Sequence, residues 1–529
     1  LALVRPDGAV ASEFAPKFPG QFADVSYGVT QAAAETPRWG YYRTPTPGAR
    51  NGGAAALMPV ERVTFSRASG PFAGSFVLTL AGAASGQRIR YTLTAPSAAG
   101  ATAADPTAAS AEYTGPITIS AATLVRAAVF SSDSTQRGFP TSAHYPRIST
   151  SGTSRLDTFS SQLPLLVIDT HGTGELVKTS GEKPAWVYTW NRPAAGSTGL
   201  GAPPSVATSA STNVRGASSS DFPKKSFTVR LDDGEGHDSP QALYGLGNFD
   251  RWALVGPWRY DRTYLHNVLT YELSNRLGRW APRTQLVEVF VNANGGDLDA
   301  QDYVGIYHLS DLVRVDPGRV AITAIDPSDD GSHSITGGYL LKADLPDASE
   351  FGFTTTRLYP GEPSVIGVDT PKADDLPAAQ RQYIQGYVQA FEDALYRDFG
   401  TAYQQRTYGD YIDRASWVDH HLLNTLTSNV DAFFRSAYLT KDRDGPLVAG
   451  PMWDNDRSMD GGEDRSANPA VWNGSDGATP FWEYGWWGLL GRDPEFVQAW
   501  IDCWASLRRT ELSVASLAAL VDALAAQIG

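Results

Sequence analysis

The strongest constraint on the fold lies between Asn429 and Asp460, where acidic loops flank two short strand-like runs. An amphipathic helical pattern precedes this segment and ends at Asn429-Val430-Asp431. The β-type runs 436–440 and 446–450 are joined by the turn sequence Asp442-Arg443-Asp444-Gly445, and Trp453-Asp454-Asn455-Asp456 follows. Antiparallel strands joined by a short turn start and finish at the same end. The pattern therefore predicts that two sets of carboxylates converge at the open end of one hairpin.

Converging carboxylates predict a site for a divalent cation and a phosphate group. Two or three carboxylates can hold the cation, and one left over can serve as a base. The chain of 529 residues has a formal net charge of −14, which argues against a nucleic-acid partner or an anionic membrane surface. It contains no apolar run close to the length of about 20 residues that spans a bilayer. We therefore expect a protein that is not transmembrane.

The pattern along the chain predicts three parts, because single cores stop growing at about 250–300 residues. Residues 1–58 are rich in proline and predict an N-terminal strand and connector. Residues 59–150 carry short β runs at regular spacing, which is typical of a small all-β sandwich. In residues 160–529 strands dominate the first half and helices the second, which predicts an α+β arrangement with the hairpin at the junction.

Two lysines stand out at the start of one predicted strand, Phe222-Pro223-Lys224-Lys225-Ser226-Phe227-Thr228-Val229-Arg230-Leu231. A period of two places Lys225 on the same face as Phe227 and Val229, the face that a strand normally turns inward. An inward lysine is costly unless an anion or a carboxylate meets it. The alternative is that Lys225 extends toward solvent at the end of the strand.

Two resemblances concern the first 150 residues. The sequences at 21–28 and 44–48 resemble the connector that follows lamin-tail-like modules in large bacterial surface proteins. The sequences at 89–92, 113–117 and 124–127 resemble the β-sandwich module appended to chitobiases and other secreted enzymes. The second resemblance implies a spacer or adhesive module, since nothing in this part offers a catalytic constellation.

A third resemblance covers residues 160–510, which are similar to the spore-coat-protein-H (CotH) family of atypical kinases. The matching sequences are Arg215-Gly216 with Ser218-Ser219, Lys224-Lys225-Ser226, Tyr260-Asp261, Val304-Gly305-Ile306-Tyr307, Gly337-Gly338-Tyr339, Asn429-Val430-Asp431 and Trp453-Asp454-Asn455-Asp456. The resemblance implies a two-lobed protein-kinase-like domain that uses ATP with Mg²⁺ or Mn²⁺. It also implies transfer of the γ-phosphate to serine or threonine hydroxyls of a protein.

The resemblance assigns roles to individual residues. It implies that Asp431 is the catalytic base and that Asp454 holds the metal, with Asp456 and Ser436 beside it. It further implies a cofactor-binding group in which Lys225 meets the nucleotide phosphates and pairs with Asp311. Arg215 and Lys224 complete the group.

The sequence departs from the family pattern at two of these positions. Asp311 replaces a glutamate and is one methylene shorter, and Ser436 replaces an asparagine that serves as a metal ligand. A serine hydroxyl reaches less far than an amide oxygen, so we expect weak metal binding. The family's Arg-Asn pair after Asp261 is His266-Asn267 here, which we interpret as structural.

Other interpretations of the same residues stay open. A calcium loop at Asp454, Asp456 and Asp460 is disfavoured because Met459 stands where such a loop needs glycine. Glycoside hydrolysis needs two facing carboxylates, and the sequence offers no defined pair. His420-His421 and the tryptophans near 482–487 favour packing over metal or sugar binding.

The strongest alternative is a catalytically decayed kinase fold that serves as a structural or adhesive component of a surface or filament. Extracellular ATP is scarce, which favours this alternative for a bacterial protein that we expect to be extracellular or at the cell surface. Leu1 reads as an internal or processed start. The expected partners are a protein substrate or the chain itself, with a homo-oligomer or surface assembly as a further expectation.

Overall fold

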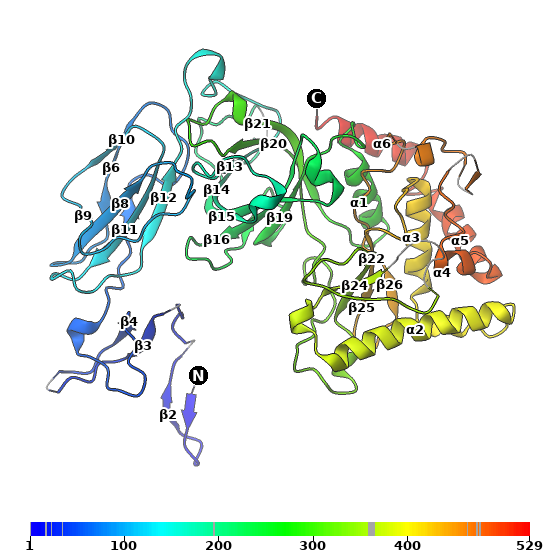
Figure 1. The fold of residues 1–529 in the computed structure, drawn as a ribbon, viewed down its shortest axis with the longest axis horizontal. Helices are drawn as coiled ribbons and strands as arrows, with labels where there is room; N and C mark the ends of the chain where they lie inside the picture. Colours follow the sequence, from blue (N-terminus) through cyan, green and yellow to red (C-terminus); the bar gives the residue numbers. More distant parts are fainter. Residues whose placement is uncertain are drawn as a thin grey trace.

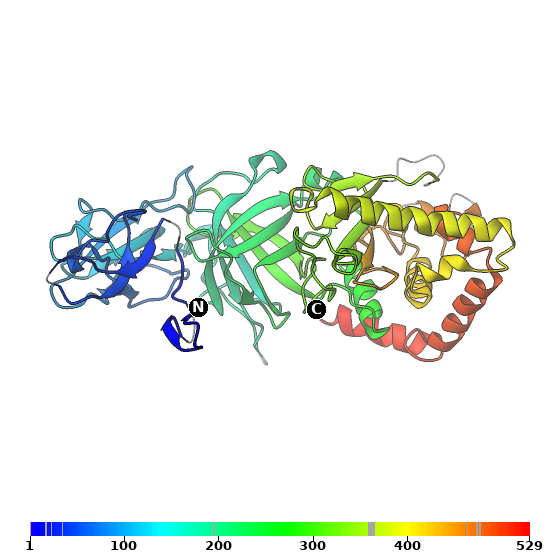
Figure 2. The same ribbon diagram turned by 90° about the horizontal axis from the view of Figure 1, so that it is seen from below.

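The computed structural model describes residues 2–15, 18–22, 24–33, 35–193, 196–357, 365–462, 464–471, 474–475 and 478–528. Strands dominate the first half of the chain and helices the second (Figure 1), so the predicted α+β class is confirmed. Figure 2 shows the parts in chain order along the long axis. None of the helices in the described part of the chain has the length and apolar character that a membrane span requires.

The first 150 residues form several small sheets. Two hairpins come first, β1 (Ala2–Val4) with β2 (Val10–Glu13) and β3 (Ser26–Val29) with β4 (Trp39–Tyr42). A four-stranded sheet follows with the order β12 (Thr141–Tyr145), β11 (Thr123–Phe130), β8 (Arg88–Thr94), β9 (Ala111–Glu112). The pairs β6 (Phe76–Leu78) with β10 (Ile117–Ile119) and β5 (Thr64–Phe65) with β7 (Leu80–Ala81) face it. Strands β5 to β12, here called the sandwich, share one apolar core between Val63 and Tyr145.

The middle of the chain closes into a seven-stranded barrel. Its order is β13 (Leu165–Asp169), β14 (Lys183–Trp190), β15 (Val206–Arg215), β16 (Ser226–Asp232), β19 (Arg251–Val255), β21 (Tyr303–Ser310), β20 (Thr284–Asn292). Closure removes exposed strand edges, and β13 pairs with β20 in parallel to complete it. The short pair β17 (Gln241–Ala242) and β18 (Asn248–Phe249) lies outside the barrel sheet. Phe227, Val229 and Leu231 are buried in the barrel core, as the period of two predicts.

Helix α1 (His266–Arg276) connects β19 to β20 and begins five residues after Asp261. The Asp261 carboxylate still accepts the backbone N–H groups of Leu265 at 3.2 Å and His266 at 3.1 Å. An aspartate can satisfy the free amides of the first helical turn from this distance because the intervening residues form a turn.

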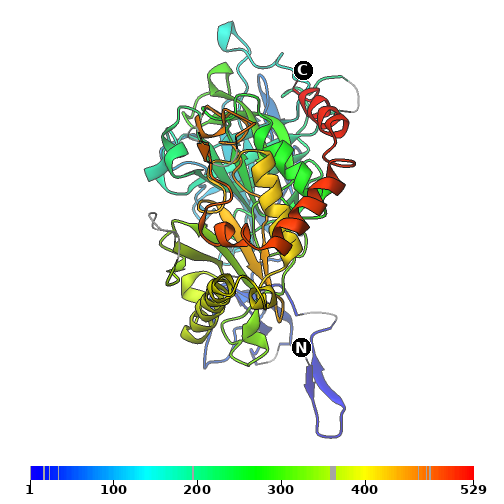
Figure 3. The same cartoon turned by 90° about the vertical axis from the view of Figure 1, so that its right-hand side faces the viewer.

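The last third of the chain packs helices on a second sheet. The sheet has the order β23 (Phe351–Phe353), β24 (Val365–Thr370), β22 (Tyr339–Asp344), β25 (Ala437–Lys441), β26 (Leu447–Ala449). Within the described residues of this part, five α-helices accompany the sheet: α2 (Ala378–Gly400), α3 (Arg414–Leu426), α4 (Gly485–Leu490), α5 (Pro494–Leu507) and α6 (Val514–Ala525). Figure 3 shows α3 and α5 side by side, in agreement with their contacts. Trp486 and Trp487 are buried in the core beneath them, so the packing interpretation of these tryptophans is confirmed.

Two buried histidines on α3, His420 and His421, should make the folded chain less stable in acid. Their exposed fractions are 7% and 0%. Burial lowers the pKa of His420 to about 4 and that of His421 to about 3. Below pH 6.5 these histidines are protonated in the unfolded chain but stay neutral in the folded chain. Their contribution to the free energy of unfolding is therefore complete above pH 6.5 and declines as the pH falls toward 4. The loss is about 1.4 kcal/mol per pH unit for each histidine.

We therefore expect the urea midpoint to fall between pH 7 and pH 5, and to fall less steeply in His421→Gln than in the wild type. Chemical unfolding at a series of pH values measures both slopes. Equal slopes for the two proteins would show that this imidazole is charged in the folded state.

Candidate functional site

The open end of the β25–β26 hairpin brings the predicted acidic residues together. Strand β22 pairs antiparallel with β25, and Ala343 lies opposite Ala437, so Asp344 and Ser436 become neighbours. The Ser436 hydroxyl donates to Asp454 Oδ2 at 3.1 Å and lies 3.4 Å from Asp344 Oδ2. Asp431 and Asp454 line one cavity together. The predicted convergence at the end of the hairpin is confirmed by this geometry.

Both partners of the central hydrogen bond adopt a left-handed backbone conformation. The φ angle is 51° at Ser436 and 60° at Asp454. Residues other than glycine rarely adopt this conformation, which costs about 1–3 kcal/mol and clusters at functional sites. The surrounding structure thus holds these two side chains in place at the expense of backbone strain.

The cavity lies between two walls of opposite character. One wall is the segment Arg215–Ser219 after β15, and the other carries Asp431, Asp454 and Asp456. Its volume of about 190 Å³ is below the range of about 300–1,000 Å³ typical of sites that bury a drug-sized ligand. Many protein atoms surround Asp454, but its side chain remains accessible to solvent through the cavity. The cavity therefore has room for the phosphates and metal of a nucleotide rather than for the whole molecule.

The carboxylates of this wall repel one another. Burial, followed by the charge of Asp454, raises the pKa of Asp456 to about 8. Burial also raises the pKa of Asp454, as do the charges of Asp431 and Asp344, whereas the Ser436 hydroxyl and Arg215 oppose the shift. A bound cation would relieve this repulsion and favour the ionised carboxylates.

Arg215 presents a positive group to the same cavity. Its guanidinium lies 5.3 Å from the centre of the Trp453 ring, and burial lowers its pKa. Within the described part of the chain, its Nη1 atom is buried and has no hydrogen-bond partner. A buried donor without an acceptor is costly, so an anion in the cavity would satisfy it. Gly216 follows with a φ of 97°, and a Cβ atom there would lie 2.1 Å from Ser219 Oγ, so the turn requires glycine.

Asp431, the predicted base, is held by two arginines. Arg457 Nη1 lies 2.8 Å from Asp431 Oδ2, and Arg465 Nη2 lies 3.7 Å from Asp431 Oδ1. The backbone N–H of Asp431 donates to Asn429 Oδ1 at 3.2 Å. These contacts hold the carboxylate at the cavity that it lines.

The expected pair between Lys225 and Asp311 is wrong. Lys225 Nζ donates to the carbonyl of Ser220 at 2.8 Å. Asp311 is fully buried and pairs with Arg283 Nε at 2.7 Å and Arg319 Nε at 3.6 Å. The physical reason is that β16 begins at Ser226, so Lys225 precedes the barrel wall and turns toward the Gly216–Ser220 loop instead of the interior.

Lys224 contacts the barrel rather than the acidic cavity. Its Nζ donates to the carbonyl of Ile306 at 2.5 Å and lies over the rings of Tyr264 and Tyr307 at 4.7 and 4.8 Å. Burial lowers its pKa to about 8. Of the four residues expected to bind the cofactor, Arg215 alone lines the cavity in the described structure.

Four residues of the site were not predicted as functional. Asp344 enters because β22 pairs with β25 across almost 100 residues of sequence, and local patterns carry no signal for that pairing. Tyr271 accepts the N–H of Asp454 at 3.0 Å, and Asn267 accepts the N–H of Asn455 at 2.7 Å. His266 contacts the Asp456 carbonyl at 2.9 Å, so the structural interpretation of His266-Asn267 agrees with a role in positioning this loop.

The comparisons with known proteins bear on the same part of the chain. Residues 212–529 match the family model described as CotH kinase protein. This match covers more than half of the chain and includes every residue of the cavity described above. No curated protein matches the chain.

Proposed function

The chain belongs to the CotH kinase protein family, and from this premise we propose that it binds ATP with Mg²⁺ or Mn²⁺ and transfers the γ-phosphate to serine or threonine. The observation that carries the proposal is the cavity with an unsatisfied Arg215 donor on one wall and clustered carboxylates on the other. Such a cavity suits a ligand that is anionic on one side and cationic on the other. A metal-bound triphosphate has this character.

Each residue takes a role that its position supports. Asp454 is the main metal ligand, and Asp344 and Asp456 are the neighbouring carboxylates that interact with it electrostatically. Arg215 and the N–H and hydroxyl groups of the Gly216–Ser219 loop bind phosphate oxygens. Asp431 accepts the proton of the acceptor hydroxyl as its oxygen attacks phosphorus and ADP leaves. Phosphoryl transfer requires mainly positioning and electrostatic stabilisation, which this set supplies.

A two-lobed kinase arrangement follows from this proposal. The barrel with α1 takes the place of the nucleotide-covering lobe, and the second sheet with its helices carries the base and the metal ligands. Lys225 supports the phosphate loop through the Ser220 carbonyl rather than through a buried carboxylate. Asp311 directly follows β21 of the barrel, and its ion pairs with Arg283 and Arg319 stabilise the fold.

The alternative function is that of a structural or adhesive component built on a decayed kinase fold. Two observations favour it: Asp431 is already paired with two arginines, and Ser436 stands where the family has asparagine. Both functions fit the expected location outside a bacterial cell and the resemblance of the first 150 residues to lamin-tail-like and chitobiase-type modules.

The test combines calorimetry with a radiolabelled phosphotransfer assay on the full chain. We expect ATP to bind in the presence of Mn²⁺ and label to transfer to the chain or to an added protein. Asp431→Asn should keep nucleotide binding and lose transfer, because only the base is removed. Wild-type protein that is folded but binds no nucleotide would refute the kinase and leave the structural alternative.

Ser436→Asn is expected to strengthen Mn²⁺ binding by about tenfold, or about 1.4 kcal/mol. An amide oxygen reaches further than the hydroxyl, and asparagine tolerates the φ of 51° at this position better than serine does. Titration with Mn²⁺ followed by calorimetry measures the change, with Ser436→Ala as the control that offers no ligand. Equal affinities for the three proteins would place the metal away from Ser436.

A further inference from the structure

A second group of ligand-type side chains lies where the sandwich meets the barrel. His144 belongs to β12 of the sandwich, Asp169 ends β13 of the barrel, and His171 follows two residues later. Their exposed fractions are 0%, 2% and 1%. One nitrogen of each imidazole and one oxygen of the carboxylate lie within 4.8 Å of one another. None of these residues lines the cavity of Asp454.

Each imidazole is oriented by a residue from the other side of this junction. His171 Nε2 lies 2.9 Å from the carbonyl of Thr94 in the sandwich. A carbonyl only accepts, so Nε2 carries the hydrogen and Nδ1 has a free lone pair. His144 Nδ1 lies 2.7 Å from the hydroxyl of Tyr188 in the barrel. That hydroxyl also donates to the His144 carbonyl at 3.1 Å, which leaves its oxygen to accept from Nδ1.

In this arrangement the two nitrogens that face each other, His144 Nε2 and His171 Nδ1, both present lone pairs. They are 2.8 Å apart. Histidines that bind metals are held in the same way, with the second ring nitrogen donating to a carbonyl, a carboxylate or another polar group. If Tyr188 instead donates to His144 Nδ1, then His144 Nε2 carries the hydrogen and donates it to His171 Nδ1. The group is then a neutral chain of hydrogen bonds.

The charge around the group favours a cation. Asp169 accepts from the backbone N–H of His171 at 2.8 Å and from Asn292 Nδ2 at 3.1 Å. Asp302 is also buried, acts electrostatically on Asp169, and accepts from Asn294 Nδ2 and the backbone N–H of Asp299. Among the described residues, neither carboxylate forms an ion pair. Buried carboxylates without a counter-charge are costly, and a divalent cation would offset two negative charges.

We propose that His144, Asp169 and His171 form a buried site for a divalent transition-metal ion, with Zn²⁺ as the preferred ion, that joins the sandwich to the barrel. Two imidazoles and a carboxylate are a common ligand set for zinc. Nitrogens bound at about 2.0–2.1 Å to a tetrahedral zinc lie about 3.3 Å apart. The two rings therefore separate by about half an ångström when the ion binds.

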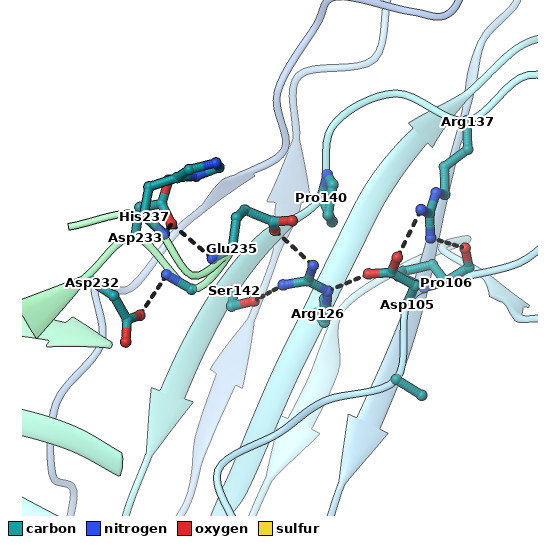
Figure 4. A network of polar contacts seen from close by, with 12 residues as sticks. Asp105, Pro106, Arg126, Arg137, Pro140, Ser142, Asp232, Asp233, Glu235 and His237 are labelled. Atoms are coloured by element: carbon teal, nitrogen blue, oxygen red, sulfur yellow. Dashed lines mark hydrogen bonds and ion pairs between the residues drawn. The ribbon is translucent and has the colours of Figure 1, made fainter. Parts of the chain in front are cut away.

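One ion pair crosses the more exposed side of the same junction. Arg126 of the sandwich donates to Glu235 in the loop after β16 at 2.6 Å, and Asp105, also of the sandwich, accepts from Arg126 at 2.7 Å (Figure 4). The metal site would fix the buried side. Together the two sets of contacts hold the sandwich in one orientation relative to the barrel.

The experiment uses the full chain, stripped with a chelator and reloaded with Zn²⁺ in excess Mg²⁺, so that Mg²⁺ competes with Zn²⁺ for the carboxylates around Asp454. Elemental analysis is expected to give about one zinc per chain, and Co²⁺ in its place should show the absorption of a tetrahedral site. Asp169→Asn and His171→Gln should lose the ion. Asp454→Asn and His237→Gln, which alter the proposed nucleotide site and an exposed histidine, should keep it.

The wild-type result decides the proposal even if the site variants fail to fold. Folded wild-type protein that retains no zinc and shows no tetrahedral Co²⁺ spectrum would overturn it and establish the neutral hydrogen-bond chain. Zinc lost in Asp454→Asn but kept in His171→Gln would also overturn it. Since the readout is metal content, failure here is independent of failure in nucleotide binding.

Discussion

Asp454→Asn is expected to weaken binding of Mn²⁺–ATP by at least about 100-fold, or about 2.7 kcal/mol, and to abolish phosphotransfer. The substitution removes the central charge of the acidic wall. It keeps the shape of the side chain and an oxygen that can accept from Ser436. Repulsion with Asp431 and Asp344 falls as well, so the folded chain should be as stable as the wild type or more stable.

Calorimetry of the variant at fixed pH measures this effect, with urea unfolding as the check on stability. Asp460→Asn is a matched control, because Asp460 lies in the same segment, is exposed, and has a similar φ of 61°. It should bind Mn²⁺–ATP like the wild type. Wild-type affinity for Mn²⁺–ATP in Asp454→Asn would show that the metal binds elsewhere in the chain.

Much of the acidic half of the site could be predicted from sequence because it depends on local structure. The helix before Asn429, the short turn at 442–445 and the period of two in each strand fix where Asp431, Ser436 and Asp454 lie. Asp344 could not be predicted in this way. It depends on β22 pairing with β25, a contact between distant segments that no local pattern determines.

The basic half of the site was less accessible to sequence reasoning. The pattern correctly placed Phe227 and Val229 inside, but it did not fix the residue at which β16 begins, and that single position turns Lys225 away from the barrel. Closure of the barrel depends on the parallel pairing of β13 with β20. Arg283 meets Asp311 because β20 pairs antiparallel with β21 and places Thr284 opposite Ser310, and Arg319 comes from the segment after β21. No local pattern predicts either contact.

Asp311 separates a structural role from a nucleotide role. Asp311→Ala is expected to lower the free energy of unfolding by about 3–5 kcal/mol, because it leaves a buried cation without its partner. The cation is Arg319, which is 4% exposed and lies 3.6 Å from the centre of the Phe249 ring. Urea unfolding measures the loss. Asp250→Ala is the control, since its contacts with Arg251 at 3.5 Å and Arg314 at 3.9 Å lie nearer the surface and should contribute about 1 kcal/mol or less.

The folded fraction of Asp311→Ala should bind Mn²⁺–ATP with wild-type affinity, because Asp311 lies outside the lining of the cavity between Arg215 and Asp454. Calorimetry corrected for the folded fraction tests this second half of the prediction. Loss of nucleotide binding in folded protein would return Asp311 to the role that the family resemblance implies, and Lys225 would then have to leave the Ser220 carbonyl to reach it. Destabilisation with intact binding would instead show that the buried carboxylate of the family pattern has become part of the barrel's own ion-pair network.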